Sequence, residues 1–241
     1  MALQRLDKVL ADLGVGTRRD LKELIRSGRV RIDGEICRKP EQKLDPTQQT
    51  LTLDGKPLVY KTLRYFMLDK PAGVVTATED RDQETVLDLL PEELRRLGLF
   101  PVGRLDKDTS GLLLLTNDGE FAHRVISPKF CVEKRYYADI DGDVTDEDVS
   151  AFAAGITLRD GTVCLPARLE SLGAGKCMVT VTEGKYHQVK RMLASRGKPV
   201  LALRRIAVGG LYVDDGLGPG GLRELDETDL CKLFNHDFGE I

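Results

Sequence analysis

The amino-acid sequence predicts an α+β protein, in which a small N-terminal α/β module precedes a larger domain with a mixed, mainly antiparallel sheet. Short helical and hairpin patterns fill the first part of the chain, whereas longer apolar strands follow from about residue 64. These strands and helices do not alternate strictly, as they would in a doubly wound parallel sheet. We therefore expect domains at residues 1–59 and 60–241, with a linker beginning near residue 61.

The N-terminal module carries helix and turn signals in close succession. Apolar residues recur at helical spacing over residues 6–13. A second helix is expected after Thr17, which can form a capping box with Asp20, and Gly28 ends it. Short alternating strands and Asp-Gly turns follow at 30–32, 33–34, 51–53 and 54–55.

The larger domain shows apolar runs of strand length and several helical patterns. A nonpolar fraction of 41% over 241 residues is ordinary for a globular protein with a buried core. The expected strands are 65–68, 112–115, 136–140 and 178–181, and the expected helices are 118–126, 146–154, 187–196 and 227–234.

Composition narrows the class of protein. No window approaches the roughly 20 apolar residues of a membrane span, so we expect no membrane association. The five cysteines are scattered without a C-x-x-C pair, which favours reduced thiols in a cytoplasmic protein over a zinc site or a disulfide framework. The net charge is −3, yet residues 1–60 hold 12 Lys+Arg against 9 Asp+Glu, so a polyanionic partner stays possible.

A glycine-bounded polar loop is the densest cluster of reactive side chains. It runs from Gly103 to Gly111 as G-R-L-D-K-D-T-S-G, and an apolar strand follows directly. Such a loop can hold a carboxylate beside a rigid strand, although loops of this composition are often simple turns. The run Asp106-Lys107-Asp108-Thr109 also invites comparison with an Asp-x-Asp-x-Thr phosphatase motif, but that chemistry places the motif after a long apolar strand rather than before one.

Three further segments contribute polar groups: residues 69–76, Lys134-Arg135-Tyr136, and residues 183–193, which run from a strand into a basic helix. With the Asp loop they supply a carboxylate, a phenol and several cations. This set suits cleavage of a glycosidic bond in a polyanionic substrate. His187 is an alternative general base, although a structural role is commoner for such a residue.

The N-terminal pattern resembles the small RNA-binding module first seen in ribosomal small-subunit protein S-four. The resemblance covers about residues 3–55 and rests on R-L-D-K-V-L-A, then G-x-x-x-R-R-x-x-x-x-I-R-S-G-R-V, then D-G. It implies that a set of basic side chains faces RNA phosphates, which give affinity without reading sequence. The set is Arg18, Arg19, Lys22, Arg26, Arg29 and Arg31.

The motifs of the larger domain resemble those of RNA pseudouridine synthases. K-P-x-G-V-V-T, G-R-L-D-x-x-T-S-G-L-L-L-L-T-N-D-G, K-x-Y and E-G-K-Y-H-Q-V-K-R-M occur in that order, and the match covers nearly the whole chain. The resemblance implies a catalytic domain with a central cleft, a flipped-out uridine as substrate, and no metal or other cofactor. It implies Asp106 as the nucleophile and Tyr136 as a residue that stacks on uracil.

Other site residues follow from the same resemblance. Lys190 stands where many relatives carry an Arg that pairs with the catalytic Asp, and K-R-M is the form of the small-subunit ribosomal RNA branch. Arg104 is expected to occupy the space of the displaced base, unless it forms a structural ion pair. Lys70 and Arg205 are expected to support the site.

The partner expected from the resemblance is small-subunit ribosomal RNA, or an assembly intermediate that contains it, bound by a monomer. Two alternatives remain open on the sequence. The same reaction could act on a large-subunit uridine, or the chain could be a non-catalytic RNA-binding factor in ribosome assembly.

Overall fold

The computed structural model describes residues 3–60 and 63–234. The chain divides into two compact units, one formed by Met1–Arg64 with Leu90–Leu99 and the other by Tyr65–Leu89 with Phe100–Ile241. The segment 90–99 thus packs with the N-terminal unit. Residue 61, where the expected linker begins, lies outside the described residues.

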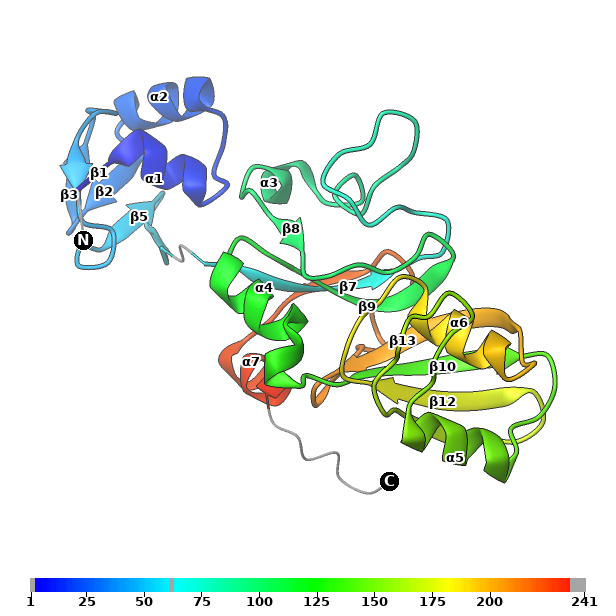
Figure 1. Cartoon of the computed structure of the whole chain (residues 1–241). Coiled ribbons are helices and arrows are strands. Elements are labelled where there is room, and N and C mark those ends of the chain that lie inside the picture. The colour runs from blue at the N-terminus through cyan, green and yellow to red at the C-terminus, as the bar shows by residue number, and fades with distance from the viewer. Residues whose placement is uncertain (1–2, 61–62, 235–241) are drawn as a thin grey trace. The chain divides into compact units, whose positions relative to one another are not determined.

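The N-terminal unit packs two helices against short strands (Figure 1). Its core contains Leu6, Leu10, Leu21 and Ile25, all fully buried. The capping box predicted for the second helix is confirmed, because the Thr17 hydroxyl accepts a hydrogen bond from the Asp20 amide and the Asp20 carboxylate accepts one from the Thr17 amide. The elements are β1 (Gln4–Arg5), α1 (Leu6–Asp12), α2 (Arg18–Arg26), β2 (Val30–Ile32), β3 (Glu35–Cys37), β4 (Lys43–Leu44), β5 (Leu51–Leu53), β6 (Lys56–Leu58) and α3 (Glu92–Arg95).

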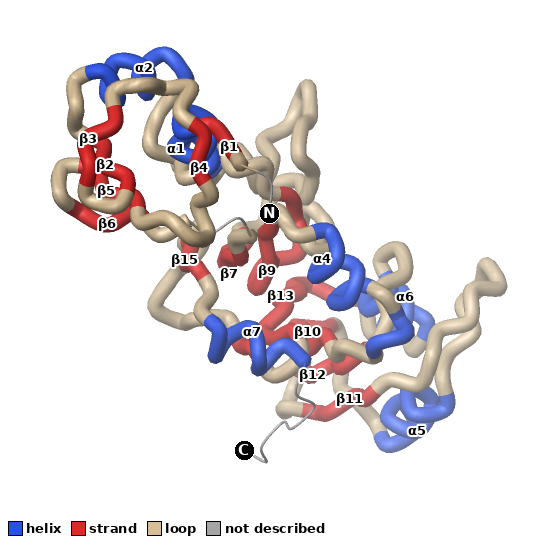
Figure 2. Tube along the Cα trace, turned by 90° about the vertical axis from the view of Figure 1, so that its left-hand side faces the viewer, coloured by secondary structure: helices blue, strands red, loops and turns tan. Residues whose placement is uncertain are grey.

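The second unit is built on a mixed sheet in the order β11-β12-β10-β13-β9-β7-β15 (Figure 2). β9 and β13 run parallel, and the other pairings among its described strands are antiparallel, as predicted. The strands are β7 (Tyr65–Lys70), β8 (Phe100–Pro101), β9 (Thr109–Thr116), β10 (Lys134–Ile140), β11 (Arg168–Ser171), β12 (Lys176–Val181), β13 (Val200–Val208), β14 (Leu211–Tyr212) and β15 (Leu222–Glu224). The helices are α4 (Gly119–Ile126), η1 (Pro128–Phe130), α5 (Asp146–Ala154), α6 (Gln188–Ser195) and α7 (Glu227–Phe234).

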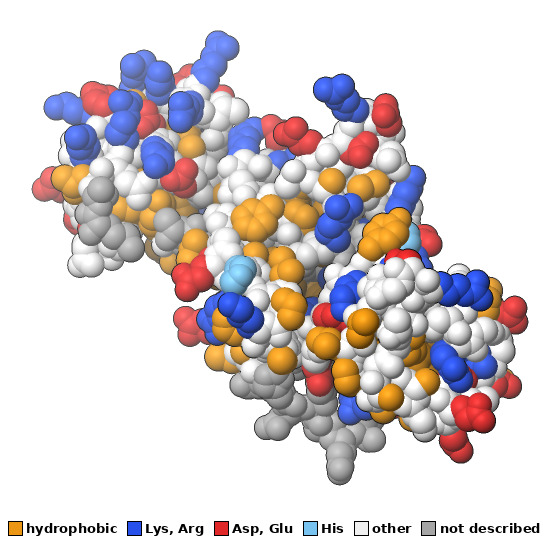
Figure 3. Space-filling model, in the orientation of Figure 1, with side chains coloured by type: hydrophobic (Ala, Val, Ile, Leu, Met, Phe, Trp, Pro, Cys, Tyr) orange, Lys and Arg blue, Asp and Glu red, His pale blue; other side chains and the backbone are white. Residues whose placement is uncertain are grey.

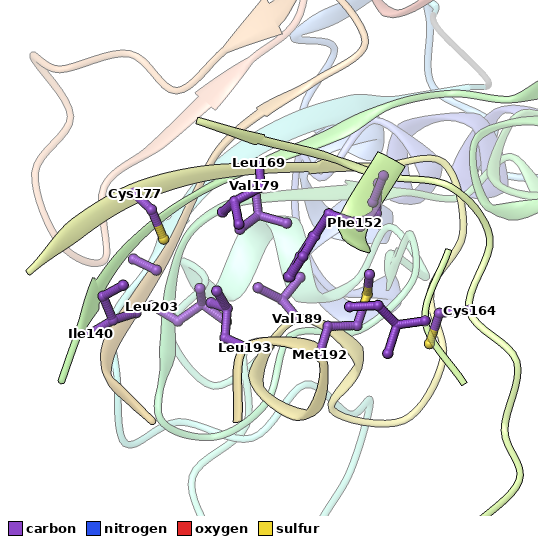
Figure 4. Packing of buried hydrophobic residues seen from close by; sticks show 14 of the residues in the cluster. Ile140, Phe152, Cys164, Leu169, Cys177, Val179, Val189, Met192, Leu193 and Leu203 are labelled. Carbon is purple, nitrogen blue, oxygen red and sulfur yellow. The ribbon is translucent and has the colours of Figure 1, made fainter. Parts of the chain in front are cut away.

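Two apolar clusters hold the helices onto this sheet. In the first, Phe152 of α5 and Met192 of α6 are fully buried against strand residues such as Val179 (Figure 4). In the second, Phe121 of α4 and Leu233 of α7 pack against residues of β7 and β9. Burial of large apolar side chains contributes roughly 1.5–3 kcal/mol each, so the first cluster holds α6 firmly on the sheet.

The predicted elements of the second unit form within about three residues of their expected bounds. The main omission is β13, which runs through the middle of the sheet. The acidic C-terminal segment contains one carboxylate that is shielded from solvent, that of Asp229. That carboxylate is buried and accepts a 2.6 Å hydrogen bond from Arg223.

Candidate active site

A pocket of about 1050 Å³ in the second unit brings together several of the predicted site residues. Its lining includes Asp106, Arg104, Tyr136, Lys190 and Arg205. They come from the loop before β9, from β10 and β13, and from the first turn of α6. Residues distant in sequence therefore meet in one concave site large enough for a nucleotide base and its ribose.

The loop that carries Asp106 is held from below by a buried lysine. The Nζ atom of Lys70, at the end of β7, lies 2.9 Å from the carbonyl oxygen of Thr109 and 3.3 Å from that of Asp106. Burial lowers the pKa of Lys70 to about 8, against the opposing influence of Asp108 and Asp106. Lys70 is absent from the pocket lining, so its part is to position the backbone of the loop.

The K-P-x-G segment supports the same loop through its backbone and a buried hydroxyl. The amide of Gly73 donates a 2.7 Å hydrogen bond to the carbonyl oxygen of Lys107. The hydroxyl of Thr76 donates a 2.7 Å bond to the carbonyl oxygen of Leu105, on the other side of Asp106. These bonds leave the Asp106 side chain free to project into the pocket while its backbone is fixed.

Asp106 has a cation beside its carboxylate. The Nζ atom of Lys190 lies 3.2 Å from Oδ2 of Asp106, and Nε2 of His187 lies 3.5 Å from Oδ1. Lys190 also makes a closer contact with Asp108, which is mostly exposed. The lysine therefore bridges two carboxylates of one loop.

The bridge changes the protonation equilibria of its members. Burial by itself would lower the pKa of Lys190, but its bonds to Asp108 and Asp106 outweigh this effect and raise it. The bond with Lys190 lowers the pKa of Asp108. Lys190 is thus held as a cation next to the Asp106 carboxylate, with which it forms an ion pair.

A small polar network shapes the segment that leads into α6. The buried Glu183 carboxylate accepts hydrogen bonds from the Gln188 amide group at 2.8 Å and from the Lys185 ammonium at 2.6 Å. His187 then adopts a left-handed backbone conformation with φ of 47°. Its ring stacks on the exposed ring of Tyr186, with 3.9 Å between centroids. The helix consequently begins at Gln188, one residue later than predicted.

The wall of the pocket below Asp106 is formed by β10 and β13. Tyr136 is half-buried there and lies opposite Arg205 in the antiparallel register. The register shifts between Arg135 and Tyr136, where β13 has one residue more than β10. Such bulges redirect side chains at the edge of active sites. Arg205 is buried, and its Nε donates a 2.8 Å bond to the carbonyl oxygen of Leu112.

The basic residues predicted to bind RNA lie in the N-terminal unit and are all exposed. Figure 3 shows Lys and Arg side chains gathered over α2 on this face. Arg29 is engaged by Asp54, with a 2.8 Å bond from Nε to Oδ1, and Arg31 donates to the carbonyl oxygen of Gly34. Arg18, Arg19, Lys22 and Arg26 form the exposed cationic side of α2.

Sequence reasoning assigned no individual role to three side chains of this site. Asp108 shares Lys190 with Asp106, and Glu183 orders the segment before α6. Lys134 is buried in the pocket wall. Its position two residues before Tyr136 was the available signal, because alternate residues of a strand face the same side. The contact of Asp108 joins it to Lys190 in a distant segment, which no local pattern reveals, whereas Glu183 contacts Lys185 and Gln188 nearby in the sequence.

The described residues contain neither a membrane-spanning helix nor a cluster of metal-binding side chains. None of the helices formed within 3–60 and 63–234 has the length and apolar character that a membrane crossing needs. Among the same residues, no group of three or more His, Cys, Asp or Glu side chains is placed to hold a metal ion.

Comparison with known proteins gives consistent matches over almost all of the chain. Residues 64–195 match the family model described as RNA pseudouridylate synthase, and residues 4–49 match that of the S4 domain. An uncharacterized RNA pseudouridine synthase YtzG of Bacillus subtilis is 44% identical over 95% of this chain and 98% of its own length. The ribosomal small subunit pseudouridine synthase A of Escherichia coli is 41% identical over 95% and 99%. A crystal structure of a pseudouridylate synthase aligns with a TM-score of 0.68 and 36% identity, covering 95% of this chain and 99% of that one.

Proposed function

Because the chain belongs to the RNA pseudouridylate synthase family, with an S4 domain before its catalytic domain, we propose that it converts one uridine of small-subunit ribosomal RNA to pseudouridine with Asp106 as the nucleophile. The observation that carries the proposal is the ion pair between Asp106 and Lys190 inside a pocket that also contains Tyr136. The small-subunit target is supported by the names of relatives such as the Escherichia coli and Pseudomonas aeruginosa enzymes.

In the proposed reaction, the Asp106 carboxylate acts on C1′, the electron-poor carbon of the ribose. As the bond between C1′ and the uracil N1 breaks, an ionised carboxylate attacks C1′ or stabilises its positive charge. Lys190 orients that carboxylate through the ion pair, although a lysine lacks the planar fork of an arginine. Tyr136 lies in the pocket wall, where its ring can stack on the uracil. Arg104, exposed at the pocket, takes the space that the flipped base leaves in the RNA.

The N-terminal unit supplies affinity rather than chemistry in this proposal. The exposed cations of α2 contact phosphates, which fixes the RNA without reading its sequence. We infer that the protein acts as a monomer in the cytoplasm, on ribosomal RNA or on an assembly intermediate of the small subunit.

Release of tritium from uracil C5 tests the reaction and its target together. Small- and large-subunit RNA labelled at that position would be incubated with the protein and with Asp106→Asn. We expect release from small-subunit RNA by the unaltered protein and background release by the variant, because an amide cannot supply the anionic nucleophile. Asp108→Asn is the matched control, since this exposed carboxylate shares Lys190 but lies at the edge of the site.

Each alternative gives a different result. Release from large-subunit RNA alone would move the target to that subunit. No release from either RNA, naked or in assembly particles, would favour a non-catalytic assembly factor. Equal release by the protein and Asp106→Asn would contradict the assignment of the nucleophile.

A further inference from the structure

Two buried cations in the pocket wall have nitrogen atoms without a hydrogen-bond acceptor. Lys134 is 8% exposed and Arg205 is 4% exposed, and both line the pocket. Within the described part of the chain, no atom accepts a hydrogen bond from Nζ of Lys134 or from Nη2 of Arg205. The Nε atom of Arg205 is engaged, because it donates to the carbonyl oxygen of Leu112.

The strand geometry directs these two cations to the same side as the tyrosine. Lys134 and Tyr136 are two residues apart on β10, so their side chains share one face. Arg205 lies opposite Tyr136 on β13, next to the register shift. Lys134 and Arg205 are close enough to repel each other, and burial together with the Arg205 charge lowers the pKa of Lys134 to about 8.

The carboxylates in the pocket lining are already engaged elsewhere. Asp106 pairs with Lys190, and Glu183 pairs with Lys185. A buried charge without a partner is costly, and proteins ordinarily pair such groups or coordinate a ligand with them. Two like charges side by side add to that cost. The arrangement therefore fits a ligand with anionic or strongly polarised oxygen atoms.

We propose that Lys134 and Arg205 bind the carbonyl oxygens of the target uracil and stabilise the negative charge that this base acquires during the reaction. The inference rests on the proposed function. When the C1′–N1 bond breaks, its electron pair leaves with the uracil, whose charge spreads over O2 and O4. The electron pair of this anion then forms the C5–C1′ bond and the Asp106 carboxylate is released. The proton on C5 passes to water, N1 takes a proton from water, and the reaction remains an isomerisation.

A backbone phosphate offers the same oxygen chemistry, but the burial favours the base. A flipped nucleotide enters a pocket with its base foremost, while its phosphates stay joined to the neighbouring nucleotides outside. Lys134 and Arg205 are more buried than Asp106, whose side chain is 27% exposed and must reach the ribose. Because Lys134 and Arg205 lie deeper in the pocket than Asp106, they face the base rather than the ribose or its phosphates.

The decisive variant is Lys134→Met, which keeps an unbranched stem and removes the charge. The rate of C5 tritium release under single-turnover conditions with saturating RNA is expected to fall by roughly 100-fold, the loss typical of removing one preorganised donor to a developing anion. The affinity for RNA should stay within about twofold, because the charge in question forms only after binding. Lys176→Met on the neighbouring strand β12 is the control, as this lysine is exposed and lies outside the pocket lining.

Other results would overturn the inference. The variant could instead weaken RNA binding, lower the slope of log affinity against log salt concentration by about 0.7, and leave the rate of tritium release from bound RNA unchanged. That result would show that Lys134 contacts a phosphate. A rate equal to that of the unaltered protein would exclude any role in the chemistry. Thermal unfolding checks the premise, since removal of an unpaired buried charge should leave the melting temperature unchanged or raise it. A clear drop would show that Lys134 has a structural partner.

Failure of the proposed function itself gives a separate result. In that case the unaltered protein releases no tritium from any ribosomal RNA, and the inference fails with it. Where the unaltered protein is active, the inference is tested by comparing its rate of tritium release and its RNA affinity with those of Lys134→Met. Arg205→Gln should show the same split between rate and affinity.

Discussion

The Nζ atom of Lys70 reaches the carbonyl oxygens of Pro71, Asp106, Lys107 and Thr109, at distances from 2.9 to 3.3 Å. Three of these carbonyls belong to the loop that carries Asp106, the proposed nucleophile. An ammonium group has three donors, so it serves these acceptors in a shared arrangement. The fully buried Lys70 side chain thereby holds the backbone of this loop through hydrogen bonds.

Replacing Lys70 by Met should both destabilise the protein and abolish efficient turnover. All four carbonyls would lose the ammonium donor, although that of Lys107 keeps the Gly73 amide and that of Asp106 keeps the Thr109 amide. Relief of the buried charge offsets part of the cost, so we expect a loss of about 2 kcal/mol in the free energy of unfolding. Urea denaturation measures this quantity. Lys107→Met is the control, because its exposed ammonium bonds only to Gln83 among the described contacts, and it should cost less than about 0.5 kcal/mol. Equal stability of Lys70→Met and the unaltered protein would contradict the bracing role.

At the scale of elements, one carboxylate joins the start of α5 to the end of α6. Asp148 completes a capping box with Thr145 and accepts a 2.9 Å hydrogen bond from Arg196, while Lys198 lies 3.2 Å away. Burial alone would raise the pKa of Asp148, but the backbone bond from Thr145 and the bonds with both cations lower it to about 2. The two helices that cover this half of the sheet are thus coupled through one ionised group.

This coupling predicts a loss of stability in acid. The native pKa of Asp148 lies below the unfolded value of 3.8, so its contribution is complete above pH 4 and disappears as the pH falls toward 2. The contribution is about 2 kcal/mol. The stability difference between the protein and Asp148→Asn, measured by urea unfolding from pH 6 to pH 2.5, should shrink over that interval. In an Arg196→Met background the shrinkage should be smaller, and a difference that stays constant with pH would refute the coupling.

The same elements show how far local sequence patterns reach. The capping boxes of α2 and α5 are visible in the sequence, because each depends on residues three positions apart. β13 was not predicted as a strand, since its adjacent arginines interrupt the apolar run. Each arginine bonds to a distant segment, Arg204 to the Asp69 carboxylate and Arg205, through its Nε, to the Leu112 carbonyl. Its parallel pairing with β9 is equally non-local.

The candidate site likewise contains residues that local motifs identify and residues that only the folded structure brings into contact. Asp106, Tyr136 and Lys190 could be named from motifs, and the pocket contains all three. The second carboxylate on Lys190, that of Asp108, and the missing acceptors around Lys134 are properties of the folded wall. They follow from the packing of β10, β13 and the Asp loop, which local spacing does not specify.

At the scale of the whole molecule, the basic residues fall into two groups, one exposed in the N-terminal unit and one at the pocket of the catalytic unit. The chain has a net charge of −3, whereas its first 60 residues carry 12 Lys+Arg against 9 Asp+Glu. In the catalytic unit Lys134 and Arg205 are buried and Lys190 is paired with Asp106, whereas the cations of α2 are exposed. Exposed cations release counterions from RNA and give salt-dependent affinity, while buried ones act on single atoms of the substrate.

The double variant Arg18→Ala/Arg19→Ala tests this division. Loss of two phosphate contacts should weaken RNA binding and reduce the slope of log affinity against log salt concentration by about one to two. The rate of tritium release from RNA that is already bound should stay within about threefold, because neither arginine belongs to the unit that holds Asp106. Lys39→Ala/Lys56→Ala is the matched control, since it removes two exposed charges of the same unit that lie outside α2. An equal loss in both double variants would indicate general electrostatic attraction rather than a specific face, and a collapse of the bound-RNA rate would give the N-terminal unit a direct part in the chemistry.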